Sequence, residues 1–505
     1  AFTLNAPLAH GTALPVVEET ATLSFGYTVT DGDGDTASGS LSIRVNDDTP
    51  TSNLVVVPST VLDDEAQILF TPGNAGPNGL FGGDVSPDTD KVTGGPGALF
   101  SMGADGLGAI DVGLPAFSVI WKDANGFAHS EAVTWGAGIR DINGATVWTA
   151  TGDVSHTSAA MLTINADGSY AFQMLAPLAH GASGFLEPAE NTASLNFTFA
   201  VTDGDGDQAG GLLTIRVNDD TPVAGNVTAA RVLDDEAQTV FTPANTGNGG
   251  GFDVDPNYGS ASGGVHTLFS MGSDGLGSIA MGLPTFSVVY KDALGFARTE
   301  TVQWDGGTRS AGGETTWTAH SEHYDLLNTP VAVLTVRADG SYDFALHAPV
   351  QHPTNSVNEE NVNLDFNYTV TDGDGDSASA RLRISVDDDR PTSQGTVTAT
   401  KLDDEAQTLF AGNDTPADGV DNASHAKGEA GALFSMGSDG LGSIALTKPG
   451  FSVVWKDGNG VAHTETVQWD GGVRSPGGVT TWTATSGHYD ATSPAAVLVI
   501  RADGS

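Results

Sequence analysis

The sequence predicts an all-β fold made of β-sandwich domains in a tandem array. Three observations predict it: short runs in which apolar and polar residues alternate, turn residues between these runs, and motifs that return at intervals of about 170 residues. Alternation with a period of two is typical of strands with one buried face. No stretch shows sustained helical periodicity, and 66 glycines among 505 residues disfavour helix.

The strands are predicted to form hairpins. Residues 117–122 and 127–135 are two alternating runs joined at Asn125-Gly126, and a second hairpin turns at Asp167-Gly168. A third hairpin flanks residues 203–207 and places on facing strands Leu195, Phe197, Phe199 and Val201, and Leu213, Ile215 and Val217. A unit with these hairpins is larger than a minimal sandwich of about 100 residues, so we expect additional strands.

Internal repetition sets the predicted domain organisation. The motif Asp-Gly-Asp-Gly-Asp occurs at residues 31–35, 203–207 and 372–376. This interval exceeds that of solenoid repeats, so each unit is long enough to have its own core. We divide the chain into residues 1–49, the C-terminal part of a sandwich; residues 50–221 and 222–390, two complete sandwiches; and residues 391–505, the N-terminal part of another. We expect these segments to belong to a longer array.

Composition excludes several partners. The chain has 19 basic and 63 acidic residues and a formal net charge of −44, which argues against nucleic acid or an anionic membrane as partner. No apolar run approaches the ~18 residues of a transmembrane helix, so no membrane insertion is predicted in this region. Cysteine is absent, and bound metal is the obvious alternative staple for an extracellular chain.

Three acidic clusters recur in each period, and they supply the candidate metal ligands. These are the Asp-Gly-Asp-Gly-Asp loop (Asp31, Asp33, Asp35; Asp203, Asp205, Asp207; Asp372, Asp374, Asp376), the linker between units (Asn46, Asp47, Asp48; Asn218, Asp219, Asp220; Asp387, Asp388, Asp389) and an Asp-Asp-Glu cluster (Asp63, Asp64, Glu65; Asp234, Asp235, Glu236; Asp403, Asp404, Glu405). Calcium takes six to eight oxygen ligands at loose geometry, which suits aspartates separated by glycine. An EF-hand is excluded, because the motif lies between strands and lacks a glutamate at position 12.

Topology predicts where the clusters meet. The Asp-Gly-Asp-Gly-Asp loop joins the last two strands of its unit, so it faces the preceding linker. The Asp-Asp-Glu cluster follows the linker by residues 51–61, enough for one strand at about 3.3 Å per residue, and so reaches the opposite end. Each junction should therefore gather the Asp-Asp-Glu cluster of one unit, the linker, and the loop of the next unit around shared Ca²⁺. The alternative is that these residues are polar turns without an ion.

Other recurring residues are assigned structural roles. A histidine follows each of three Ala-Pro dipeptides, at His10, His180 and His352. We expect these histidines to pack by hydrogen bonds rather than to bind zinc. A segment rich in Gly, Pro, Asn and Asp, near residues 71–95, differs in length between copies and is predicted to be a surface loop. An enzyme should show a singular constellation, whereas every acidic cluster here recurs, so no catalytic site is predicted.

Several motifs resemble the repeat domains of giant adhesins secreted by type I systems, the RTX and biofilm-associated class of Gram-negative bacteria. They are "ADGLG" at 104–108, "LTINADGSYAFQMLAPLAH" at 162–180, and the "YTVTDGDGD" and "LSIRVNDDTP" block that ends at Pro50. The resemblance implies elaborated Ig-like or cadherin-like sandwiches, rigidified by calcium, that form the extracellular extender of a cell-surface adhesin and support adhesion and biofilm formation. Neighbouring repeats of the same chain are then the main partners.

A second function remains open. The repeats could instead form a self-assembling extracellular filament, sheath or matrix, in which they associate laterally with copies of the chain or bind extracellular polysaccharide.

Overall fold

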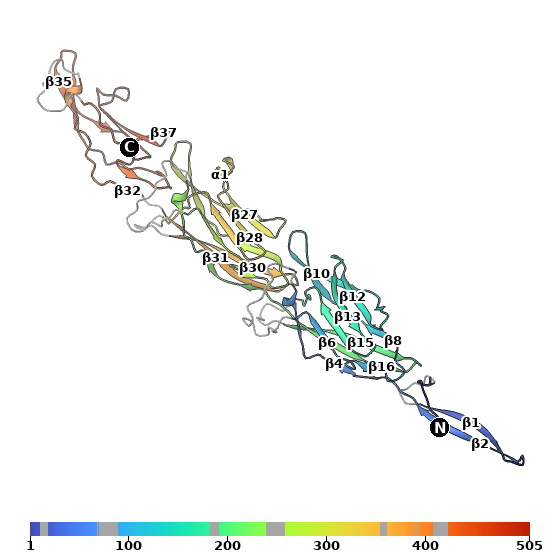
Figure 1. The fold of residues 1–505 in the computed structure, drawn as a ribbon. Helices are drawn as coiled ribbons and strands as arrows, with labels where there is room; N and C mark the ends of the chain where they lie inside the picture. Colours follow the sequence, from blue (N-terminus) through green and yellow to red (C-terminus); the bar gives the residue numbers. More distant parts are fainter. Residues whose placement is uncertain are drawn as a thin grey trace.

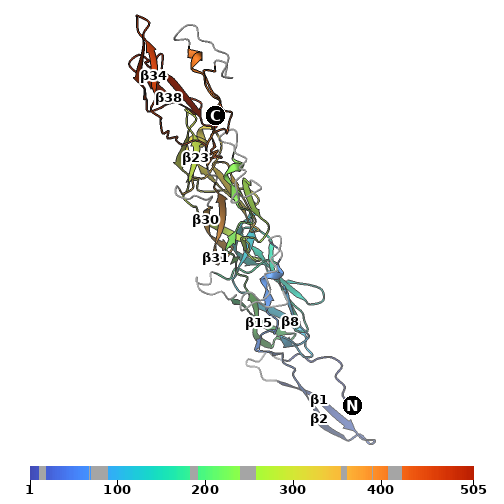
Figure 2. The ribbon, with the colours of Figure 1, turned by 90° about the vertical axis from the view of Figure 1, so that its left-hand side faces the viewer.

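The computed structural model describes residues 1–10, 19–67, 69, 89–181, 191–238, 258–353, 361–388, 391–407 and 423–505, without the side chains of Glu65, Glu236 and Glu405. The chain is elongated: a hairpin at the N-terminal end is followed by two β-sandwiches and a C-terminal group of strands, in sequence order (Figure 1). A view turned by 90° has the same narrow outline, so the units follow one another along one axis (Figure 2). Most of the segment predicted to be a variable loop lies outside the described residues.

The first sandwich comprises β3 to β16. Its strands are β3 (Thr51–Ser52), β4 (Val55–Val56), β5 (Leu62–Asp63), β6 (Lys91–Gly94), β7 (Phe100–Ser101), β8 (Leu107–Gly113), β9 (Ser118–Lys122), β10 (Ala128–Trp135), β11 (Ile139–Arg140), β12 (Thr146–Gly152), β13 (Ser158–Ile164), β14 (Tyr170–Met174), β15 (Thr192–Asp203) and β16 (Gln208–Asn218). One sheet has the order β4-β16-β15-β8, with β5 also on β16. The other has the order β6-β14-β13-β12-β10-β9, with β11 on β12.

The long hairpin β15–β16 supplies one wall of the core. Leu195 lies opposite Ile215, and Phe197 opposite Leu213, so the apolar positions of both strands share one face. All are buried, as the alternation predicted. Phe197 meets Phe172 of β14 at 5.3 Å between ring centroids, which joins the two sheets through the core.

The second sandwich, β17 to β31, repeats this plan. Its elements are β17 (Val223–Ala224), β18 (Val227–Thr228), β19 (Leu233–Asp234), β20 (Ser260–Gly263), β21 (Phe269–Ser270), β22 (Leu276–Gly282), β23 (Ser287–Lys291), β24 (Ala297–Thr301), β25 (Gln303–Trp304), β26 (Thr308–Arg309), β27 (Glu314–His320), α1 (Glu322–Leu326), β28 (Ala332–Arg337), β29 (Tyr342–Leu346), β30 (Val362–Asp372) and β31 (Ser377–Asp387). The sheets have the orders β18-β31-β30-β22 and β20-β29-β28-β27-β25, and β23–β24 form a hairpin. The prediction of an all-β sandwich array is confirmed.

Two groups of strands flank the sandwiches. The N-terminal hairpin consists of β1 (Thr20–Thr30) and β2 (Thr36–Asn46). The C-terminal segment contains β32 (Thr392–Ser393), β33 (Phe434–Ser435), β34 (Ser452–Lys456), β35 (Ala462–Thr466), β36 (Gln468–Trp469), β37 (Val473–Ser475), β38 (Val479–Thr485) and β39 (Ala496–Arg501). Short 3₁₀ turns η1 (Asp64–Ala66), η2 (Asp235–Ala237) and η3 (Asp404–Gln407) follow the first Asp of each Asp-Asp-Glu cluster. Within the described ranges, no helix has the length and apolar character needed to cross a membrane.

The stretch expected to form one strand after the linker, residues 51–61, contains the two short strands β3 and β4, and β5 follows it. Pro58 lies between β4 and β5, where its ring removes a backbone donor and interrupts the ladder. Both β4 and β5 nevertheless run parallel to β16, and Asp63 ends beside Asn218. The Asp-Asp-Glu cluster is therefore carried to the end of the sandwich where β16 leaves, as the topology predicted.

Candidate metal centre

Acidic side chains from three segments meet between the first and second sandwiches. Asp64 comes from η1, Asp219 from the linker after β16, and Asp374 from the loop between β30 and β31. Asp64 is held by the main-chain N–H of Leu178, which donates to its Oδ1 at 3.0 Å. Ligand atoms of Asp219, Asp274 and Asp374 lie within 4.8 Å of one another, and so do those of Asp64, His180 and Asp219.

Asp274 is, with Asp64, one of two fully buried carboxylates in this group. It lies in the turn before β22 and is 0% exposed. Neither of its carboxylate oxygens has a hydrogen-bond partner among the described residues. A buried carboxylate without donors is strongly destabilising unless a proton or a cation compensates it.

The surroundings disfavour ionisation of these carboxyl groups. Burial raises the pKa of Asp274 well above its usual range, and the charges of Asp374, Asp64 and Asp219 raise it further. Burial and the neighbouring Asp374 also raise the pKa of Asp372 to about 10. Because like charges repel at this separation, a positive charge among the oxygens would favour ionisation of the whole group.

Glycine and main-chain donors shape the loop that presents Asp374. Asp372 accepts hydrogen bonds at Oδ1 from the N–H groups of Gly375, at 2.9 Å, and Asp376, at 2.8 Å. Gly375 has a φ of 118°, which other residues rarely adopt. The loop therefore curls around the Asp372 side chain, and Asp374 at its tip reaches the preceding unit. There Asp374 Oδ2 accepts hydrogen bonds from the N–H groups of His180, at 2.9 Å, and Gly181, at 3.2 Å.

His180 lies beneath the cluster with its side chain 0% exposed. Its Nδ1 is 3.1 Å from Asp219 Oδ1 and 3.4 Å from Asp64 Oδ2, and its Nε2 is 3.2 Å from the carbonyl oxygen of Val217. Burial acts to lower its pKa, but the hydrogen bond to Asp219 and the charges of Asp64 and Asp219 together raise that pKa to about 9. The expectation that this histidine packs by hydrogen bonds is confirmed.

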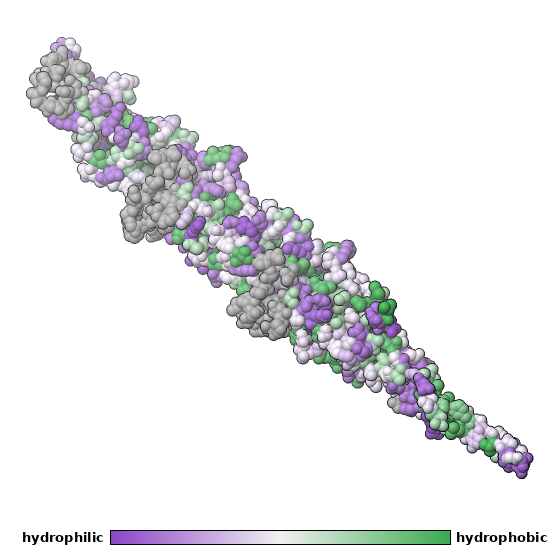
Figure 3. Space-filling view, in the orientation of Figure 1, coloured by the Kyte–Doolittle hydropathy of each residue, from purple (hydrophilic) through white to green (hydrophobic). Residues whose placement is uncertain are grey.

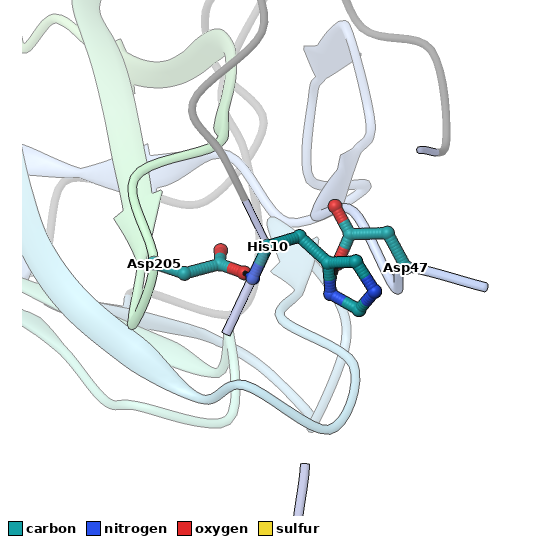
Figure 4. A group of neighbouring side chains, drawn as sticks. All are labelled: His10, Asp47 and Asp205. Carbon is teal, nitrogen blue, oxygen red and sulfur yellow. Dashed lines mark hydrogen bonds and ion pairs between the residues drawn. The ribbon is translucent and has the colours of Figure 1, made fainter. Parts of the chain in front are cut away.

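The junction before the first sandwich has the same arrangement. The N–H of His10 donates to Asp205 Oδ2 at 2.9 Å, and its Nδ1 lies 3.0 Å from Asp47 Oδ1, so His10 lies between the linker and the following loop (Figure 4). Asp105 completes a group with Asp203 and Asp205 in which ligand atoms lie within 4.8 Å. Burial and the charge of Asp205 raise the pKa of Asp105.

The junction after the second sandwich contains the corresponding residues. Asp235 accepts the N–H of Val350 at 3.0 Å and lies 3.4 Å from Nδ1 of His352. The same Nδ1 is 3.2 Å from Asp388 Oδ1. Burial raises the pKa of Asp235 well above its usual range, and Asp439 and Asp388 contribute to the shift.

The structure thus brings together part of the predicted ligand set. The carboxylates gathered at the three junctions are Asp47, Asp203 and Asp205; Asp64, Asp219, Asp372 and Asp374; and Asp235 and Asp388. Asp207 and Asp376 end the same loops, and Asp63, Asp234 and Asp387 flank the clusters on paired strands.

Other predicted ligands lie elsewhere or have different partners. Asn218 accepts the hydroxyl of Thr192 at 3.1 Å, as Asn46 does from Thr20, and Asp220 accepts the N–H of Ser273 at 2.6 Å. Asp48 likewise accepts the N–H of Ala104 at 2.7 Å. Asp31, Asp33 and Asp35 lie exposed at the tip of β1–β2, Asp403 and Asp404 are at or near η3, and Asp389 and the side chains of Glu65, Glu236 and Glu405 lie outside the described residues.

Sequence reasoning missed Asp105, Asp274 and Asp439 as members of these clusters. Each belongs to an Asp-Gly-Leu-Gly motif that returns with the same period as the other acidic clusters. That periodicity was the available signal, but an Asp-Gly pair before a strand is also typical of an ordinary turn. Packing of this turn against the linker brings the side chain into the junction.

The donor set fits a hard divalent cation. Its atoms are carboxylate oxygens from separate segments, and one histidine lies beside them. Calcium accepts such oxygens in variable number and geometry. Magnesium demands nearly ideal octahedral geometry and keeps several waters, and structural zinc prefers thiolates and imidazoles. Both oxygens of Asp274 lack a hydrogen-bond partner among the described residues, and its ligand atom lies within 4.8 Å of those of Asp219 and Asp374.

Comparison with known proteins adds little. No protein-family model and no characterised sequence matches the chain. Among solved structures, the chain is similar to mouse clustered PcdhgC3 EC1-3 (8% identity, 75% of this chain and 78% of that chain, TM-score 0.19), to Drosophila N-cadherin EC1-4 (11%, 95% and 82%, 0.17), and to a tetra-tandem repeat in the extending region of a large adhesion protein (14%, 97% and 89%, 0.17). At these TM-scores the similarities carry no argument, and the fold class rests on the sheets themselves.

Proposed function

We propose that this chain is a non-catalytic extracellular extender, a rod of β-sandwiches stiffened by Ca²⁺ at each junction, within a cell-surface adhesin. By the motif resemblance, the adhesin is of the RTX and biofilm-associated class secreted by type I systems of Gram-negative bacteria. The observation that carries the proposal is Asp274, a fully buried carboxylate without hydrogen-bond donors that lies among carboxylates of the preceding unit, the linker and its own unit.

The mechanism follows from the origins of these ligands. Asp64 and Asp219 move with the first sandwich, whereas Asp274, Asp372 and Asp374 move with the second. A divalent cation between them would replace mutual repulsion by attraction and would resist any bending that separates the two sets. Because the junctions recur with each unit, the rod would stiffen along its whole length.

The net charge favours single rods over lateral bundles. The chain carries a net charge of −44, so parallel copies repel one another at low ionic strength. On the face shown in Figure 3, hydrophobic residues form small separate groups along the rod. A bundle would need a long continuous contact face.

Chelation tests the calcium proposal. Small-angle X-ray scattering and differential scanning calorimetry are performed on the full chain with EDTA, with 2 mM Ca²⁺, and with Mg²⁺ at the same concentration. We expect EDTA to lower Tm by several degrees and to reduce the maximum dimension, and Ca²⁺, but not Mg²⁺, to restore both. A site at a thousand times its Kd contributes about 4 kcal/mol. Unchanged Tm and dimension on chelation would refute the proposal.

Electron microscopy separates the extender from the assembling filament. Negatively stained full-length chains in Ca²⁺ should be single straight particles of the same length. Ordered bundles or tubes at the same protein concentration would support lateral assembly instead.

A further inference from the structure

The hairpin β9–β10 of the first sandwich extends into the second (Figure 1). Phe127, directly after the turn, is 1% exposed and belongs to a buried cluster whose other members, among them Leu268, Phe269 and Leu276, come from the second sandwich. A turn residue of an isolated unit would be exposed, as Val461 is at the same hairpin position of the C-terminal segment, with 54% exposure. Phe127 is therefore buried by its neighbour.

The second sandwich forms a socket for this aromatic ring. The guanidinium of Arg309, in β26, lies 4.0 Å from the centroid of the Phe127 ring, a cation–π contact. The N–H of Gly312 donates to the carbonyl oxygen of Asn125 at 3.1 Å, which joins the two turns through the main chain. Ile120 and Ala128 at the base of the hairpin are also buried, and a Cβ on Gly373 would lie 2.9 Å from each of their side chains.

A similar arrangement occurs at the next junction. Phe296, in the turn between β23 and β24, is 0% exposed, and Arg474 lies 4.3 Å from its ring centroid. The N–H of Gly478 donates to the carbonyl oxygen of Leu294 at 2.6 Å. The N–H of Ala297 donates to the carbonyl oxygen of Leu441 at 3.1 Å. Both junctions therefore contain a buried aromatic ring, an arginine over it and a main-chain bond between the two turns, although the donor of that bond is shifted by one position.

Hydrogen bonds within the turn hold the hairpin in shape. Asp123 Oδ1 accepts the N–H of Asn125 at 2.8 Å and that of Phe127 at 2.9 Å. Asp292 accepts the N–H groups of Leu294 and Phe296 in the same way, each at 2.9 Å. These hydrogen bonds fix the aromatic residue at the turn, so little conformational entropy is lost when it enters the socket.

The socket adjoins the acidic cluster, because the hairpin also packs against Gly373, between Asp372 and Asp374. Arg309 Nη2 donates to the carbonyl oxygen of Gly277 at 3.2 Å, in the Asp-Gly-Leu-Gly motif that contains Asp274. The ring contact and the main-chain bond involve no carboxylate, so they do not require a cation. The acidic junction and the docked hairpin are two attachments between the same pair of sandwiches. Two attachments at different distances from the rod axis resist rotation of one sandwich relative to the next, whereas a single attachment does not.

We propose that hairpins β9–β10 and β23–β24 are calcium-independent latches, each of which docks an aromatic residue into the following unit and fixes its rotation about the rod axis. The residue at the position of Phe127, Phe296 and Val461 sets the strength of each latch. The partner of this surface is the next repeat of the same chain.

Spin labelling tests the latch in the full chain. The sequence has no cysteine, so Val154→Cys and Val265→Cys, at exposed positions of the first and second sandwich near their junction, give two unique labels. Pulsed electron–electron double resonance, performed in EDTA, measures the width of the distribution of distances between the two spin labels. We expect Phe127→Val to broaden it at least about twofold over the parent, and Arg309→Lys, which lacks the flat guanidinium, to broaden it less.

Phe296→Val is the matched control, since it makes the same substitution at the other junction and should leave the width at the parent value. Circular dichroism and Tm close to those of the parent verify that each variant folds. A parent-like width for Phe127→Val, or equal broadening by Phe296→Val, would overturn the latch. The distance widths of the variants are compared in EDTA, so this test does not depend on calcium binding. If Ca²⁺ has no effect on Tm or on the dimension of the chain, that result counts against the proposed function but not against the latch.

Discussion

The main-chain N–H of His180 donates a hydrogen bond to the side chain of Asp374, 194 residues further along the chain, at 2.9 Å. His10 and Asp205 make the same bond over 195 residues, also at 2.9 Å. In both junctions the central aspartate of the glycine-rich loop thus has two functions. One oxygen accepts main-chain donors of the preceding unit, and the other lies buried within the acidic cluster without a hydrogen bond.

These two functions can be separated by substitution. Asp374→Asn keeps an acceptor oxygen but removes the charge, so in EDTA we expect stability equal to or above that of the parent. Asp374→Ala leaves the N–H groups of His180 and Gly181 without their acceptor and should destabilise by about 1–3 kcal/mol. Both variants should lose much of the calcium-induced gain. Urea denaturation with and without Ca²⁺ measures each quantity.

Asp111→Asn is the control for this pair. It removes a carboxylate at an exposed position of β8, outside the acidic clusters, and should change neither quantity. A calcium-induced gain in Asp374→Asn as large as in the parent would exclude Asp374 as a ligand.

Asp274→Asn tests the buried carboxylate directly. An amide is neutral and can donate to the neighbouring carboxylates as a protonated carboxyl group does, so the variant should be at least as stable as the parent in EDTA. Calcium affinity at that junction, measured by isothermal titration calorimetry, should fall at least about tenfold, which corresponds to about 1.4 kcal/mol. Asp111→Asn, at an exposed position of β8, should leave the affinity unchanged. Parent-like affinity in Asp274→Asn would remove Asp274 from the site.

Much of this organisation was predictable, because hairpins are local and their pattern is strong. Asn125-Gly126 marks its turn, and the alternation in 195–201 fixes which face of β15 is buried. The meeting of the acidic clusters followed from strand direction alone. In an antiparallel hairpin the loop must lie opposite the exit of the last strand, and that constraint does not depend on packing detail.

What the sequence did not predict depends on contacts between units. The alternating pattern of β9 and β10 is the same whether Phe127 packs within its own unit or into the next one. Asp274 likewise has the pattern of a turn residue until the turn packs against the linker. The single strand expected over 51–61 is interrupted: β3 pairs with β7, β4 pairs with β16, and after β4 Pro58 cannot donate to the ladder.

Gly272 should be essential to the linker. Its φ is 66°, and a Cβ there would lie 2.1 Å from Oδ2 of Asp220. Gly272→Ala should therefore destabilise the second sandwich by about 1–3 kcal/mol in urea denaturation. Gly264→Ala is the control, because Gly264 has no heavy atom within 4 Å of the added Cβ, and its effect should be below about 1 kcal/mol. Similar losses in both variants would show that the close approach to Asp220 is relieved by a small shift of the loop.

The contribution of contacts between the two sheets can be measured by making the same Phe→Ala substitution at two equivalent positions, one inside a sandwich and one in the hairpin β1–β2. Phe197 is 1% exposed and contacts Phe172 and Trp135 across the sandwich, at 5.3 and 5.8 Å between ring centroids. Phe25 has the same motif position in β1, where it is 45% exposed. Phe197→Ala should lower the stability of the first sandwich by about 3–5 kcal/mol, since it leaves a cavity between the sheets. Phe25→Ala should change the unfolding transition by less than about 0.5 kcal/mol. Calorimetry on both variants makes the comparison, and equal losses would mean that the hairpin β15–β16, rather than the inter-sheet contact, determines the stability of the sandwich.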